Sequence, residues 1–241
     1  MTVPLRQAGP GTSAWLAASG LAAAALLRSS FTARTGSARF YLLSASLIGS
    51  YAAGALGASP VRWHGDDSHG DDSHGGDSNG GDGTDSRGSA ADAAGTLIVV
   101  PALTGAATFA CFYVIARVAR RHRGLRRAIA SVLRYVDGGS TPLVVLLAAG
   151  GGVAEEMYFR GALWNGPCPL RSTTLAYAAS TAATGNPALV LAGLATSVVF
   201  GWQRAATGGV LAPAVSHVTW SVLMLRYLPP LFRTGADRNI P

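Results

Sequence analysis

The chain has 241 residues, of which 49% are hydrophobic and only 13% are charged, and its mean hydropathy is +0.30. Such a chain cannot surround a core with polar side chains, so the composition excludes an ordinary soluble domain and predicts a membrane protein. The formal net charge of +7 results from 19 basic and 12 acidic residues, and all the basic residues are arginines, without any lysine. Because these arginines gather at the ends of apolar segments, they indicate a positive-inside bias rather than nucleic-acid binding.

Six apolar segments are candidates for membrane-spanning helices, since a span needs about 20 mostly apolar residues. They cover residues 11–27, 39–57, 95–116, 141–164, 187–203 and 209–228. A shorter segment, 172–184, has the composition of a broken or re-entrant helix, which is tolerated only where protein shields it. The sequence therefore predicts an all-α fold, a polytopic transmembrane helix bundle with six to seven spans.

Composition divides the chain into five regions. They are two N-terminal transmembrane helices (1–57), a disordered acidic Gly/Asp/His loop (58–92), a transmembrane helix plus a basic amphipathic segment (93–134), the core with the candidate chemistry (135–230) and a C-terminal tail (231–241). In the loop, His64, His69 and His74 recur among aspartates and could hold a divalent cation loosely. They lack tetrahedral ligand spacing, so a solvated linker is the simpler interpretation.

Arginine placement predicts the orientation of the bundle. Arg28, Arg34 and Arg39 separate the first two spans, and seven arginines follow the third span within 117–134. We expect both connections to be cytoplasmic, which puts the amino end outside and the carboxyl end inside if there are seven spans. The segment 117–134 also has amphipathic helical spacing and is expected to lie on the anionic inner leaflet. The exclusive use of arginine indicates a GC-rich genome and hence a bacterial plasma membrane.

Only two glutamates occur in the chain, and they are adjacent, at 155 and 156, within an apolar segment. An acid at membrane depth costs about 3 kcal/mol by insertion scales, so a function is its default explanation. On a helix, Glu156 and Arg160 share a face and can neutralise each other. Glu155 is turned by about 100° and lacks that partner, as suits a general base. The alternative is that both acids only lock helix packing by pairing with arginines.

A second candidate centre lies in the segment 209–228. His217 is the only histidine in any predicted span, and Ser221 follows four residues later on the same helical face. A lone buried histidine is often a packing residue. Here an unpaired acid is expected at a similar depth, which favours a functional role.

Glu155, Glu156 and Arg160 form the motif EExxxR, and His217 lies in a C-terminal helix introduced by the letters LAP. In a polytopic chain this combination resembles the CAAX-protease and bacteriocin-processing family (CPBP, or Abi) of intramembrane endopeptidases, over about residues 140–228. The resemblance implies that Glu155 activates water to attack a peptide carbonyl, that Glu156 and Arg160 brace it, and that His217 and Ser221 stabilise the oxyanion. It also implies a CPBP-like core and a membrane-anchored peptide or protein as substrate. The glutamic-type mechanism needs no cofactor, while an older zinc mechanism is not excluded.

The chain departs from the family pattern in two places. Family members carry FxxxH after EExxxR, and that histidine helps to position the water, but no histidine occurs between 123 and 216. The best counterpart is 177–181, which ends on Thr181 and is followed by GNP; the stretch 200–204 is less suitable because it directly precedes the LAP helix. Threonine orients a water but does not accept a proton near neutral pH or bind zinc well. Ser221 stands where the family has Asn or Asp, and it keeps one donor.

Three hypotheses follow. The first is a CPBP-type intramembrane endopeptidase, glutamic-type or metallo-, impaired by the missing histidine. The second is a catalytically inactive CPBP-fold protein that serves as a membrane binding or scaffold module, which the same missing histidine favours. The third and weakest is a transporter that uses the acids as a proton relay, for which the chain shows no inverted repeat.

Overall fold

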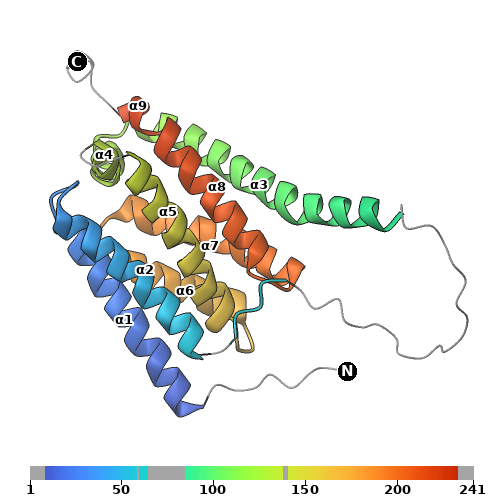
Figure 1. Cartoon of the computed structure of the whole chain (residues 1–241). Helices are drawn as coiled ribbons and strands as arrows, with labels where there is room; N and C mark the ends of the chain where they lie inside the picture. The colour runs from blue at the N-terminus through green and yellow to red at the C-terminus, as the bar shows by residue number, and fades with distance from the viewer. Residues whose placement is uncertain (1–8, 59, 65–84, 138–140, 233–241) are drawn as a thin grey trace, which may run out of the picture.

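The structure, a computed structural model, describes residues 9–58, 60–64, 85–137 and 141–232. Within these residues every regular element is a helix, which confirms the all-α prediction for that part of the chain (Figure 1). The elements are α1 (Pro10–Thr32), α2 (Ala38–Ala58), α3 (Asp85–Ala119), α4 (Arg123–Asp137), α5 (Thr141–Glu156), the π-helix η1 (Met157–Ala162), α6 (Pro169–Ala182), α7 (Pro187–Thr207), α8 (Leu211–Tyr227) and α9 (Pro229–Phe232).

Five of the described helical stretches are long and apolar enough to cross a membrane: α1, α2, Gly95–Ala119 of α3, Pro142–Ala162, and α7. The chain is therefore a multi-pass membrane protein with five candidate spans in its described part. The predicted six or seven included 172–184 and 209–228, which fold as α6 and α8 with 14 and 17 residues. Both are short of the usual span of about 20 residues.

Glycine and proline set these shorter lengths. Gly185 and Gly208 have φ of +69°, a conformation that ends a helix and favours glycine, and they lie after α6 and before α8. Pro229 follows α8 and begins α9. Inside the bundle, α8 packs against α3, α5 and α7, while α6 packs against α7.

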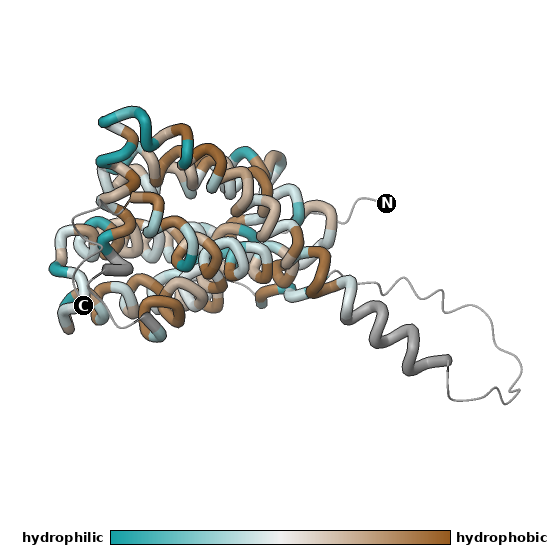
Figure 2. Tube along the Cα trace, turned by 90° about the horizontal axis from the view of Figure 1, so that it is seen from above, coloured by the Kyte–Doolittle hydropathy of each residue, from teal (hydrophilic) through white to brown (hydrophobic). Residues whose placement is uncertain are grey.

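One end of the bundle collects the arginines, and we call it the arginine-rich end. It comprises the α1–α2 connection, α4 and α9, which lie together in Figure 1. The predicted amphipathic segment 117–134 divides into the last turn of α3, a turn, and α4. Ile129 and Leu133 of α4 pack with Ala116 and Leu228, while the α4 arginines are exposed. Many of the most hydrophilic residues lie at helix ends, and apolar residues run along the helices (Figure 2).

The borders of the acidic loop differ from the predicted 58–92. Residues 60–64 are non-helical and bind the turn before α8, where the Val210 N–H donates to the Arg62 carbonyl and the Leu211 N–H to the Trp63 carbonyl, both at 3.0 Å. Helix α3 begins at Asp85, so residues 85–92 are helical, in keeping with their alanine content. His64 is exposed, while His69 and His74 lie outside the described residues.

Helix α3 approaches α8 closely at Gly105. A Cβ added to Gly105 would lie 2.4 Å from the carbonyl oxygen of Ser216, closer than packed atoms allow. The Ser216 hydroxyl in turn donates to the Pro101 carbonyl at 2.7 Å. This contact fixes the part of α8 that carries His217.

We expect Gly105→Ala to lower the free energy of unfolding by about 1–3 kcal/mol, because the added methyl group overpacks the α3–α8 contact. Gly95→Ala in the same helix is the matched control, since a Cβ there meets nothing within 4 Å. The control should be neutral or more stable by up to about 1 kcal/mol. Denaturant unfolding of both variants in detergent measures the difference, and equal midpoints would contradict the packing interpretation.

Candidate active site

The two glutamates end α5, at the point where the helix widens into η1. The Leu163 N–H donates to the Tyr158 carbonyl five residues earlier, at 2.9 Å, and such π-turns occur frequently at functional sites. From α7, the Arg204 side chain donates through Nε to the Arg160 carbonyl at 2.8 Å. The stretch 200–204 thus braces the π-helix.

Glu156 lies at the centre of a buried cluster. Arg160 donates through Nη1 to Glu156 Oε1 at 3.1 Å, and both side chains are almost completely buried. This is the pairing that the four-residue spacing predicts. The same oxygen lies 2.9 Å from His217 Nδ1. Glu156 therefore links the helix end to α8 and fixes the orientation of the imidazole ring.

His217 also packs between helices. Its ring lies against the Phe200 ring of α7, with centroids 5.1 Å apart. On the α5 side, a Cβ added to Gly152 would lie 3.2 Å from His217 Cγ. The absence of a side chain at Gly152 therefore lets α8 bring its imidazole close to α5.

Glu155 and His217 face each other across a short gap. Glu155 Oε2 lies 4.0 Å from His217 Nε2, and Nε2 is the ring nitrogen that Glu156 leaves free. The Glu155 side chain is 21% exposed, in contrast to Glu156 at 0%. A single water that hydrogen bonds at about 2.6–3.2 Å to each atom fits this separation.

Tyr177 of α6 is a further contact of Glu155. Its hydroxyl donates to Glu155 Oε2 at 2.6 Å, and its ring centroid lies 5.2 Å from the Arg160 guanidinium carbon, a favourable cation–π distance. Tyr177 was not among the predicted site residues, since position 177 entered the prediction only as the aromatic residue of the FxxxH counterpart. The signal that could have indicated Tyr177 is its hydroxyl, which lies one helical turn before Thr181.

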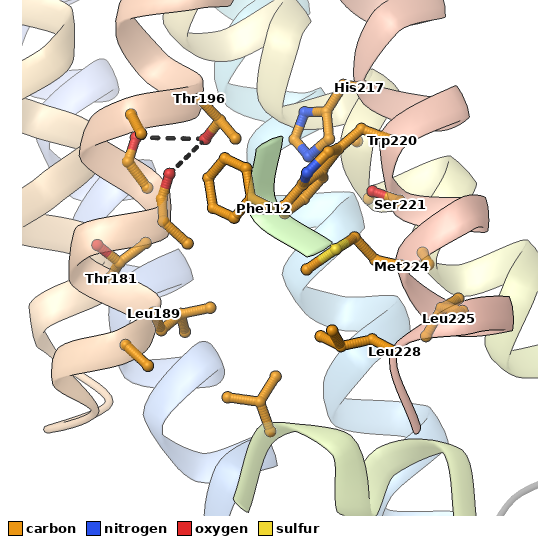
Figure 3. A pocket seen from close by; sticks show the side chains of 18 of the residues that line it. Phe112, Thr181, Leu189, Thr196, His217, Trp220, Ser221, Met224, Leu225 and Leu228 are labelled. Carbon is orange, nitrogen blue, oxygen red and sulfur yellow. Dashed lines mark hydrogen bonds between the residues drawn. The ribbon is translucent and has the colours of Figure 1, made fainter. Parts of the chain in front are cut away.

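An apolar cavity of about 820 Å³ opens beside this pair. Its lining includes Glu155, Thr181, His217 and Ser221, and it extends to the apolar residues of α4. Figure 3 shows His217, Trp220 and Ser221 of α8 on one side of the cavity and Thr181 on the other. The structure thus brings four of the six predicted site residues to one cavity, and it buries Glu156 and Arg160 behind them.

The family model described as type II CAAX prenyl endopeptidase, Rce1-like, matches residues 137–223. This segment is an Rce1-like CAAX prenyl endopeptidase (CPBP) family domain. The match confirms the family that EExxxR and the later histidine indicated, and it contains all the residues of the cluster and gap described above. No curated protein and no solved structure is significantly similar to the chain.

Thr181 of this Rce1-like domain is limited in the hydrogen bonds that it can offer to a ligand in the cavity. Its hydroxyl hydrogen bonds to the carbonyls of Tyr177 and Ala178, at 3.2 and 3.0 Å. The single hydroxyl proton is therefore used within α6, although the side chain lines the cavity. Thr181 contributes shape and an acceptor to the cavity rather than a free donor.

Two donors on α8 have no partner among the described residues of the Rce1-like domain. The Ser221 hydroxyl makes no hydrogen bond there, and the buried Trp220 Nε1 has no acceptor. Both residues line the cavity next to His217. The spacing from His217 predicted Ser221 but not Trp220, since an apolar helix gives no signal that an indole N–H lacks an acceptor.

The donor set of the Rce1-like domain does not fit zinc. Catalytic zinc sites use three protein ligands drawn from His, Cys, Asp and Glu, and the described residues contain no group of three such side chains arranged to hold a metal ion. Glu156 Oε1 already faces the Arg160 guanidinium and His217 Nδ1. A cation at this oxygen would be repelled by the arginine, so Glu156 is not available as a metal ligand.

Proposed function

We propose that the protein is an intramembrane endopeptidase in which Glu155 activates water to hydrolyse a peptide bond of a membrane-associated substrate. The observation that supports this best is the 4.0 Å gap between Glu155 Oε2 and His217 Nε2, on the lining of the apolar cavity. A carboxylate that must act as a base needs a position next to the water it deprotonates. The family match supports the reaction class.

In the proposed reaction, Glu155 takes a proton from the water as the water oxygen attacks the peptide carbonyl carbon. The carbonyl becomes a tetrahedral oxyanion, which is stabilised by the donors of Ser221 and Trp220 that have no partner among the described residues. In its imidazolium form His217 adds an Nε2–H, while its Nδ1–H is held by Glu156 Oε1. The carbon–nitrogen bond then breaks, and Glu155 returns its proton to the leaving amine. Glu156 and Arg160 hold the imidazole and the helix end in place during both steps.

The cavity supports a substrate that is apolar along most of its bound length. It runs from Glu155 and His217 to Leu125 and Leu133 of α4, at the arginine-rich end. We propose that this end is cytoplasmic, that the membrane is a bacterial plasma membrane, and that the substrate is a membrane-anchored peptide or protein. The positive-inside rule supports the orientation.

One observation favours the alternative of an inactive scaffold. The Thr181 hydroxyl, at the place of the family's positioning histidine, is bonded to its own helix. A scaffold would need the cluster of Glu156, Arg160 and His217 for stability but would have no use for a water site at Glu155. The endopeptidase therefore requires the carboxylate of Glu155, and the scaffold does not.

A reconstitution experiment tests the proposal. The purified protein in liposomes is mixed with a panel of lipid-tethered peptides in ¹⁸O-labelled water, and the products are analysed by mass spectrometry. Hydrolysis predicts one ¹⁸O atom in the new carboxyl terminus and a loss of the product when Glu155 is changed to glutamine. Cleavage that persists at the same rate in the variant, or no cleavage of any peptide in the panel, would count against the endopeptidase.

A further inference from the structure

We infer that Tyr177 is the positioning residue for Glu155 in this chain, in place of the histidine that related domains carry at the position of Thr181. The inference rests on the proposed function. Its starting point is the 2.6 Å hydrogen bond from the Tyr177 hydroxyl to Glu155 Oε2, the same oxygen that faces His217 Nε2. Tyr177 therefore fixes the carboxylate in the orientation that presents it to the gap.

The surroundings of Tyr177 hold its hydroxyl in this place. The ring packs edge-on against Phe159, with centroids 4.9 Å apart, and it lies over the Arg160 guanidinium. On the other side, a Cβ added to Gly193 of α7 would meet the Tyr177 ring at 3.0 Å and Thr181 Cγ2 at 3.2 Å. Tyr177 and Thr181 therefore lie side by side against α7. The Tyr177 hydroxyl can thus perform the positioning task that a histidine at position 181 would perform.

We expect Tyr177→Phe to lower kcat by about 100-fold with little change in KM, since misplacing a reacting group by about 1 Å has an effect of that size. The double variant Y177F/T181H restores the FxxxH pattern and should recover most of that loss. The melting temperature of both variants reports on folding. A merely structural tyrosine would not regain activity through a histidine one turn away.

The outcome separates this inference from the proposed function. If the wild-type protein cleaves its peptide and Tyr177→Phe cleaves it equally fast, the positioning role is overturned and the endopeptidase stands. If the single and double variants are equally slow, tyrosine has not replaced the histidine. A wild-type protein that cleaves nothing counts against the endopeptidase itself.

A separate observation at the arginine-rich end carries a second inference. A pocket of about 440 Å³ lies between the end of α1, α4 and the turn from α6 to α7. Arg28, Arg127 and Arg134 line it together with the hydroxyl residues Thr32, Ser131 and Thr184. None of the three arginines forms an ion pair with any side chain that the structure describes. The three hydroxyl protons are donated to backbone carbonyls, so the guanidinium groups are the donors that the pocket offers, and guanidinium groups bind phosphate well.

The walls of this pocket are held by hydrogen bonds. Arg28 donates through Nη1 to the Ala183 carbonyl at 3.1 Å. Asn186 donates through Nδ2 to the Ala128 carbonyl and to Ser131 Oγ, both at 2.8 Å, and thereby ties α4 to the start of α7. The three walls therefore keep their relative positions before any ligand arrives.

We propose that this pocket binds the phosphate of an anionic phospholipid headgroup. The arginine-rich end lies where apolar spans end, which is the depth of headgroups in a bilayer. Phe31 lines both this pocket and the large apolar cavity, so the acyl chains of a bound lipid have an apolar surface next to the phosphate site.

The double variant R127Q/R134Q tests the site against R120Q/R121Q, which removes the same charge from the neighbouring turn outside the pocket. Native mass spectrometry in detergent counts the phosphatidylglycerol molecules retained, with phosphatidylcholine and inorganic phosphate as the other arms. We expect wild-type protein and R120Q/R121Q to retain phosphatidylglycerol over phosphatidylcholine, and R127Q/R134Q to need about 30-fold more lipid, as the loss of two arginines predicts. Equal losses in both variants would overturn the site, and displacement of the lipid by inorganic phosphate would assign it to free phosphate instead.

Discussion

Replacing Glu155 by glutamine is expected to lower the hydrolysis rate by about 10²- to 10⁴-fold, the usual contribution of a general base. The amide cannot take a proton from the water, but it has the same shape and keeps an oxygen that accepts the Tyr177 hydroxyl. Folding should therefore be preserved. The measurement is kcat/KM for one lipid-tethered peptide in proteoliposomes, together with the melting temperature of each protein.

The same variant separates the two candidate functions. An endopeptidase loses cleavage in Glu155→Gln at unchanged stability and abundance. A scaffold built on this fold keeps its cellular phenotype in the variant, because the buried cluster of Glu156, Arg160 and His217 is untouched. Unchanged cleavage in the variant would remove Glu155 from the mechanism, whatever the substrate.

The adjacent acids differ because the helix turns by about 100° between them. Glu156 points into a fully buried environment with an arginine and an imidazole. Glu155 points to the cavity, where the Tyr177 hydroxyl is its one hydrogen-bond donor among the described residues. The first arrangement neutralises a charge, and the second keeps a carboxylate oxygen available. A difference of one position in sequence thus separates a structural role from the proposed chemical role.

The helical period made part of this site predictable. Glu156 and Arg160 had to share a face, and the chain holds only one histidine in an apolar helix, so Glu156, Arg160 and His217 could be expected without coordinates. The relation of Ser221 to His217 follows from the same spacing. These inferences concern single helices, where sequence separation determines geometry.

Contacts between helices could not be predicted in this way. Tyr177 meets Glu155 because α6 packs beside the end of α5. The Trp220 ring packs against Phe112 and His217, and its Nε1 has no acceptor among the described residues. The change from α5 to η1 also has no signature in the motif, although it determines where Arg160 lies. Hydropathy alone also gives no helix lengths: it counts 209–228 as a span, while Gly208 and Pro229 limit α8 to 17 residues, and five candidate spans lie in the described part of the chain.

The largest effect on stability is expected from Arg160→Ala. Arg160 is fully buried, and its Nη1 donates a hydrogen bond to Glu156 Oε1 at 3.1 Å. Its removal leaves a buried carboxylate without its guanidinium partner, which typically lowers the free energy of unfolding by about 3–5 kcal/mol. Denaturant unfolding in detergent, followed by tryptophan fluorescence, measures the loss.

The double variant E156Q/R160M distinguishes charge from packing. It removes both charges while keeping similar volumes, and the glutamine oxygen still accepts from His217 Nδ1. We expect it to recover at least half of the stability that Arg160→Ala loses, because exchanging a whole buried ion pair for groups of like shape is often neutral. If the double variant is as unstable as the single one, Arg160 stabilises the fold through its shape and its contacts with Phe159 and Tyr177. Neutralising the charge of Glu156 would then not be the reason that the fold requires Arg160.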